Sequence, residues 1–83
     1  SSDLAFHEFA QALGKRAQQF DARDDAGRID HAFCLCLSRP PERDERRRLL
    51  ALLRQQREAG SEAAAWTALA RVLLNLDETI TKE

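Results

Sequence analysis

Residues 60 to 80 read GSEAAAWTALARVLLNLDETI, and this stretch decides the fold. Its large apolar side chains recur every three or four residues, which places them on one face of an α-helix. Gly60 is suited to end a preceding helix, and Ser61 is suited to cap this one because its hydroxyl can accept a hydrogen bond from the first turn. We therefore expect the central helix of a helical core here. The side chains expected to face inward are Trp66, Leu69, Ala70, Leu73, Leu76 and Ile80.

Three further amphipathic segments precede this helix. The first begins at an N-cap Asp3 and runs to about residue 20, and the second runs from a cap at Asp24 or Asp25 to about Ser38. The third is expected to open at Pro41, whose fixed backbone angle suits the first helical turn, and to end at Gly60. The inward residues expected in these three helices are Phe6, Phe9, Ala10, Leu13, Ala17 and Phe20, then Ile29, Ala32, Phe33, Cys36 and Leu37, then Leu49, Leu52, Leu53 and Gln56.

The composition points to the same fold class. The chain has 83 residues, of which only three are Gly and two are Pro, and the β-branched residues that a sheet needs are scarce. A second independent core would need roughly 50 more residues. The sequence therefore predicts an all-α protein, a small antiparallel four-helix bundle, with one domain over residues 1–83. Gly14, inside the first helix, costs about 1 kcal/mol relative to Ala and indicates close approach of a neighbouring helix.

Charge and hydropathy narrow the classes of partner. The formal net charge of the chain is −1, whereas a dedicated nucleic-acid-binding domain carries a strong positive charge. Nucleic acid is therefore not expected as a partner. No apolar run approaches the roughly 20 residues that cross a bilayer, so no membrane span is expected in this segment.

Metal and catalytic chemistry have little support in the residue pattern. His31, Cys34 and Cys36 include the usual metal-ligand types, but residues two apart on a helix point about 160° apart at about 100° per residue. The two cysteines therefore cannot share one tetrahedral ion, and we expect Cys36 to be a small core residue. A nucleophile, a base and an orienting group cannot be assembled from the sequence. We expect no enzyme, and no catalytic, cofactor-binding or metal-binding residues in this segment.

A basic stripe is the strongest polar pattern. Arg43, Arg47, Leu50, Arg54 and Arg57 recur at alternating steps of four and three along the third helix. Such a stripe can bind phosphate or an acidic partner. The ordinary alternative is a solvated face with local ion pairs, for example Arg54 with Glu58 one turn later.

Residues 65 to 78, AWTALARVLLNLDE, resemble a known family, together with Arg28-Ile29 and the turn over residues 37 to 41. The chain is similar to the C-terminal helical domain of unknown function, the planctomycete-specific domain, of large planctomycete cytochrome c-like multidomain proteins. The resemblance covers most of residues 28 to 80, although Ser38 stands where the family usually has Gly and Thr79 where it has Phe. It implies the C-terminal fragment of a larger bacterial protein, exported or associated with the cell envelope, with any haem in another domain. The family has no established active site, so no residue roles are carried over.

These observations favour a non-catalytic helical module that packs against other domains of a larger bacterial protein. The alternative is an anion- or nucleic-acid-binding module that uses Arg43, Arg47, Arg54 and Arg57. A packing module should expose more apolar surface than an isolated domain needs. The candidate residues for such a patch lie off or at the edge of the inward stripes, and at least two of them should be accessible and adjacent. They are Leu35, Leu50, Val72 and Leu74.

Overall fold

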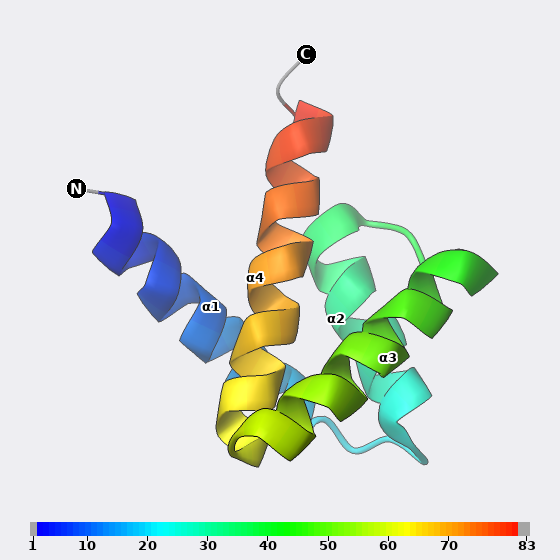
Figure 1. Cartoon of the computed structure of the whole chain (residues 1–83). Coiled ribbons are helices and arrows are strands. Elements are labelled where there is room, and N and C mark those ends of the chain that lie inside the picture. The colour runs from blue at the N-terminus through cyan, green and yellow to red at the C-terminus, as the bar shows by residue number, and fades with distance from the viewer. Residues whose placement is uncertain (1, 82–83) are drawn as a thin grey trace.

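A computed structural model describes residues 2 to 81, and the side chains of residues 4 to 77. Four α-helices follow one another, and no strand occurs within this described range. They are α1 Ser2–Gln19, α2 Asp25–Leu37, α3 Arg43–Ala59 and α4 Glu62–Thr81. The expected all-α four-helix bundle is confirmed. Successive helices run in opposite directions, and α3 crosses α4 obliquely (Figure 1).

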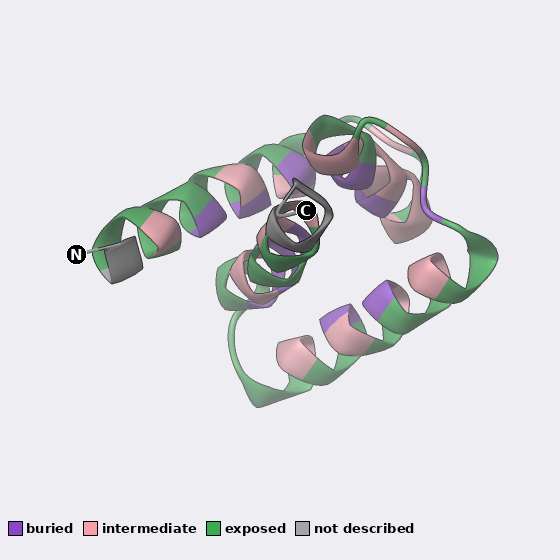
Figure 2. Cartoon of the chain, turned by 90° about the horizontal axis from the view of Figure 1, so that it is seen from above, coloured by how far each residue is buried: buried purple, intermediate pink, exposed green. Residues whose placement is uncertain are grey.

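Helix α4 occupies the centre of the bundle. It contacts each of the other three helices, whereas α1 and α3 lie on opposite sides of it (Figure 2). The buried faces of α1, α2 and α3 turn toward this central helix. The expectation that the last helix organises the core is therefore confirmed. None of the helices, over the part that is described, is long and apolar enough to cross a membrane.

Local capping signals set most of the helix ends. The Asp24 side chain accepts a hydrogen bond from the Gly27 backbone N–H at 3.0 Å and caps α2. The Ser61 hydroxyl accepts one from the Ala64 backbone N–H at 3.1 Å and caps α4. Helix α2 ends as expected before Ser38, whose φ of 60° reverses the chain in the left-handed region.

Two expected helix starts are wrong. Helix α3 begins at Arg43, two residues after the position expected from Pro41, because Glu42 and Glu45 form a reciprocal capping box there. The Glu42 backbone N–H donates to a Glu45 carboxylate oxygen at 2.7 Å. Pro41 is instead buried ahead of the helix. Asp3 lies inside α1 rather than at its N-cap, and its side chain is outside the described residues.

The core consists mainly of the residues that helical periodicity selects. Trp66 is completely buried, as predicted, and its indole N–H donates to a Glu62 carboxylate oxygen at 2.9 Å. Cys36, Leu37 and Leu52 pack against the core while remaining partly accessible. The buried hydrophobic residues are Ala10, Ala17, Ile29, Ala32, Phe33, Leu49, Leu53, Ala65, Trp66, Leu69, Ala70 and Leu73.

Three large residues expected in the core are exposed instead. Phe9 is 69% exposed, whereas its neighbour Ala10 is buried and Gly14 closely approaches the Trp66 backbone of α4. Neighbouring helix positions point about 100° apart, so Phe9 is turned away from this contact. Phe20 follows the end of α1 and stacks on the His31 ring, with 3.7 Å between ring centroids. Leu76 of α4 is 37% exposed and lines a hollow with Glu45, Arg48 and Leu49 of α3. The side chain of Ile80 is outside the described residues.

Candidate docking surfaces

An apolar groove is lined by residues of α2, α3 and α4. Helices α3 and α4 diverge from the short turn that joins them (Figure 1). We call this groove the α3/α4 groove. Its volume is about 220 Å³. The residues that line it are Phe33, Glu45, Arg48, Leu49, Val72 and Leu76.

Val72 and Leu76 form the accessible apolar side of this groove. They are four residues apart, so they lie on one face of α4, and they are 36% and 37% exposed. Phe33 and Leu49, at the base, are buried. The groove therefore presents two apolar side chains that continue the protein core outward to the surface.

The polar rim of the groove is held by an ion pair. Arg39 donates to both carboxylate oxygens of Glu45, at 2.9 Å and 3.0 Å, and its guanidinium lies 4.9 Å from the centre of the Phe33 ring. The hydrogen bonds from Arg39 and then from the Glu42 backbone lower the pKa of Glu45 to about 2. The carboxylate is thus ionised and fixed beside the apolar row.

This pair predicts a loss of stability in acid. The ordinary pKa of Glu45 is 4.5 and its folded value is about 2, so its stabilising effect is present above pH 4.5 and is lost as the pH falls toward 2. We expect the urea midpoint to fall between pH 6 and pH 2.5, and to fall less in Glu45→Gln, which has no carboxylate to protonate. Denaturation followed by circular dichroism at several pH values checks this. An equal fall in both proteins would contradict the assignment.

Arg57, the last arginine of the predicted stripe, is engaged by carboxylates of two other helices, although 34% of its side chain is exposed. It donates to Asp25 of α2 at 2.7 Å and, through two nitrogens, to both carboxylate oxygens of Glu62 of α4 at 2.7 Å. These hydrogen bonds hold the pKa values of Asp25 and Glu62 below their ordinary range. Arg57 therefore ties three helices together and has a structural role.

The other three predicted arginines lie together. Arg43, Arg47 and Arg54 surround a shallow hollow of about 280 Å³ with Arg46, and Leu50 and Ala51 complete its lining. We call this the arginine hollow. Arg46 was missed because it is not in the alternating series Arg43, Arg47, Leu50, Arg54, although it lies three residues after Arg43 and four before Leu50. It is bound to Asp30 of α2 at 2.9 Å and 3.1 Å.

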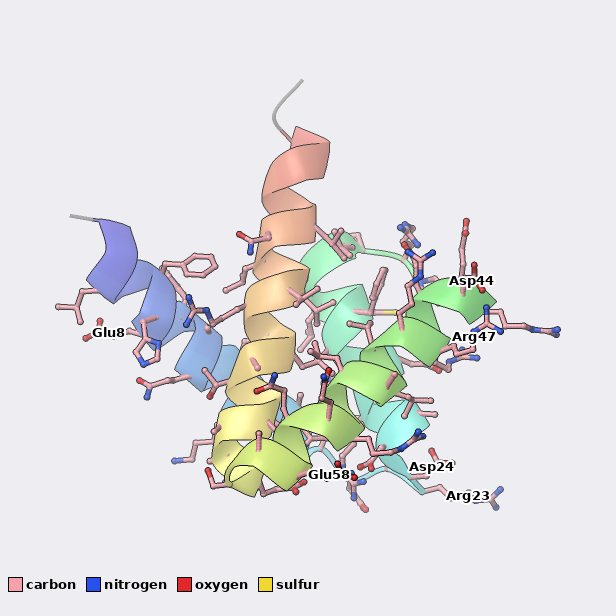
Figure 3. The ribbon with its side chains drawn as sticks, viewed as in Figure 1. Glu8, Arg23, Asp24, Asp44, Arg47 and Glu58 are labelled. Atoms are coloured by element: carbon pink, nitrogen blue, oxygen red, sulfur yellow. The ribbon has the colours of Figure 1, made fainter. Side chains whose placement is uncertain are left out.

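One of these arginines, Arg47, forms the local ion pair that is expected of an ordinary solvated helix face. Arg47 pairs with Asp44 in the same turn of the helix, and both extend into solvent at the outer end of α3 (Figure 3). The suggested pair of Arg54 with Glu58 is not among the ion pairs formed by the described side chains. The stripe is therefore partly a set of structural ion pairs and partly an accessible basic surface.

The four leucine and valine candidates divide between different surfaces. Leu35 is 44% exposed and Val72 lies in the α3/α4 groove, while Leu50 and Leu74 are half-buried. Leu50 lines the arginine hollow, on the other flank of α3 from Val72. Two of the four, Leu35 and Val72, are accessible, as expected, but no described hollow contains both, so the expectation that two of them are adjacent stays a prediction. Leu76, rather than another candidate, lies beside Val72.

The cysteines are not brought into a metal centre by the described side chains, which contain no cluster of three or more His, Cys, Asp or Glu residues suited to a metal. Cys34 is exposed and Cys36 is half-buried, and both are free thiols. Burial raises the pKa of the Cys36 thiol, and the nearby negative charge of Asp77 raises it further. Cys36 therefore favours its neutral thiol form and packs as a small apolar side chain.

A wider hollow of about 500 Å³ lies between α1 and α4. Its polar lining includes His7, Gln11, Thr67 and Arg71, and three alanines form much of the remainder. The residues around it include no carboxylate that could orient His7 as a general base. This hollow therefore offers less specific chemistry than the α3/α4 groove or the arginine hollow.

Comparison of the chain with family models, with curated proteins and with solved structures finds no match. Function is therefore inferred from the chain's own surfaces.

Proposed function

We propose that this chain is a non-catalytic helical packing module of a larger bacterial multidomain protein, and that another domain of that protein docks in the α3/α4 groove. The observation that carries the proposal is the pair of accessible apolar side chains, Val72 and Leu76, beside the buried Phe33. The resemblance to the planctomycete-specific domain supports a multidomain parent and, with it, export or association with the cell envelope.

The groove offers a modest but useful binding energy. Fully burying a Val or Leu side chain contributes about 1.5 to 3 kcal/mol, and Val72 and Leu76 retain roughly a third of their exposure. Completing the burial of both would contribute on the order of 1 to 2 kcal/mol, or about tenfold in affinity. A docking domain that fits this groove presents apolar side chains to α4 and polar groups to Arg48 and the Arg39–Glu45 pair.

The proposal is tested by placing charge in the groove. The gene regions that flank this chain define the remainder of the parent protein, which can be expressed separately and titrated with the chain by calorimetry. The double variant Val72→Glu, Leu76→Glu should bind at least tenfold more weakly, since both carboxylates would lose water in an apolar contact. Both positions are accessible, so the variant should keep the helical circular dichroism spectrum of the parent.

The matched control is Phe9→Glu, which changes an exposed apolar residue on α1, across the bundle from α3. It should bind like the original chain. The proposal fails if the gene encodes no further domain, if the original chain does not associate with the remainder, or if the groove variant and the control bind equally well.

A further inference from the structure

We propose that the arginine hollow is a second binding site, and that it takes an acidic amphipathic segment of a partner protein. Carboxylates of the segment would pair with Arg43, Arg47 and Arg54, and one apolar side chain would lie against Leu50 and Ala51. The site is on the other flank of α3 from the α3/α4 groove. It therefore does not depend on docking in that groove.

The arginines of α3 separate into structural and available groups. Arg46 and Arg57 are bound to carboxylates of α2 and α4 through well-formed hydrogen bonds. Arg43 and Arg54 are exposed and belong to none of the ion pairs formed by the described side chains. Among the described side chains, Arg47 pairs with the exposed Asp44. Such surface pairs contribute little to stability, so a partner carboxylate can replace Asp44 at low cost.

The spacing fits a short helical partner. Arg43, Arg47, Leu50 and Arg54 follow steps of four, three and four, so they form one row along α3. At about 1.5 Å of rise per residue, the row is about 16 Å long, which matches about three turns of a second helix. A leucine near the middle of that helix would meet Leu50. Acidic residues three and four positions to either side would then lie opposite Arg47 and Arg54, and one seven positions away would lie opposite Arg43.

The lining favours a carboxylate-bearing peptide over nucleic acid. The hollow contains Leu50 and Ala51, which give an apolar side chain a surface to contact. Asp30 and Asp44 are bonded to two of the lining arginines, which leaves few unpaired positive charges for the many closely spaced phosphates of a duplex. Arginine also binds a carboxylate through two parallel hydrogen bonds, which adds geometric specificity.

The probe is a fluorescein-labelled synthetic helical peptide of fifteen residues, with leucine at its centre and glutamates three, four and seven positions to either side. Binding to the 83-residue chain is followed by fluorescence anisotropy at low salt. Arg43→Glu and Arg54→Glu should each weaken binding at least fivefold. A second peptide, with serine in place of the central leucine, should bind at least threefold more weakly than the first.

The matched control is Lys15→Glu, which makes the same change in net charge on α1, a helix that does not contact α3. This variant should bind the leucine peptide as the original chain does. The proposal is overturned if no binding is detected, if Lys15→Glu weakens binding as much as Arg54→Glu, or if the serine peptide binds equally well. Tighter binding of a 20-base-pair DNA duplex at the same salt concentration would assign the hollow to nucleic acid instead.

Discussion

Trp66→Ala is expected to destabilise the protein by about 3 kcal/mol or more, which is most of the stability available to so small a core. The side chain is completely buried in the helix that contacts all three others. The substitution leaves a large cavity and removes the hydrogen bond from the indole N–H to Glu62. Urea denaturation followed by far-ultraviolet circular dichroism measures the effect without relying on tryptophan fluorescence.

Phe9→Ala is the matched control for this prediction. It truncates another aromatic side chain, but one that is 69% exposed, so it should change the free energy of unfolding by no more than about 0.5 kcal/mol. A Trp66→Ala protein with the midpoint of the original chain would contradict the central position of this residue. Equal losses in the two variants would show that burial is not the reason for the effect.

Much of the fold could be predicted because its signals are local. Asp24 and Ser61 cap the helices that follow them, and each acts through a backbone N–H three residues away. The inward stripe of α2 was correct for the same reason, since periodicity within one helix selects Ile29 and Phe33 without reference to any neighbour. The prediction that α3 begins at Pro41 was wrong because the Glu42–Glu45 capping box sets its start at Arg43.

The angle between helices could not be obtained from periodicity. Leu76 continues the inward stripe of α4, but it lines an open hollow beside α3 and is not covered by that helix. Phe9 belongs to the apolar face of α1, but the contact with α4 passes through smaller neighbours. The apolar stripe of a helix shows which of its faces points to the core. It does not show how far along that face a neighbouring helix packs.

For the candidate surfaces, too, the sequence predicted features that depend on one helix and missed those that depend on contacts between helices. The spacing of Arg43, Arg47 and Arg54 was sufficient to bring these three residues to one hollow. The role of Arg57 depended on Asp25, which is 32 residues away, so the sequence pattern could not separate it from the others. Val72 was correctly selected as accessible, but the depth of its groove depends on Phe33 and Leu49 from two other helices.

Gly14→Ala is expected to destabilise the protein by about 2 kcal/mol, although alanine is the better helix former. A Cβ at this position would lie 2.8 Å from the carbonyl carbon and oxygen of Trp66 and 2.9 Å from the Thr67 nitrogen. These are backbone atoms of α4, which cannot rotate away, so α1 would have to move outward and loosen the packing of Ala10 and Ala17. Overpacking of this kind costs about 1 to 3 kcal/mol, which exceeds the gain in helix propensity of about 1 kcal/mol.

The comparison that isolates this contact is Gly60→Ala. At Gly60 a Cβ would meet its nearest atoms at 3.9 Å, an ordinary van der Waals distance, and the φ of −160° is open to any residue. Its free energy of unfolding should therefore stay within about 1 kcal/mol of the original, which urea denaturation measures for both variants. If Gly14→Ala proves as stable as the original chain, α1 and α4 do not approach closely at Trp66. The expected order instead places Gly14→Ala clearly below Gly60→Ala, because only the first substitution forces two helices apart.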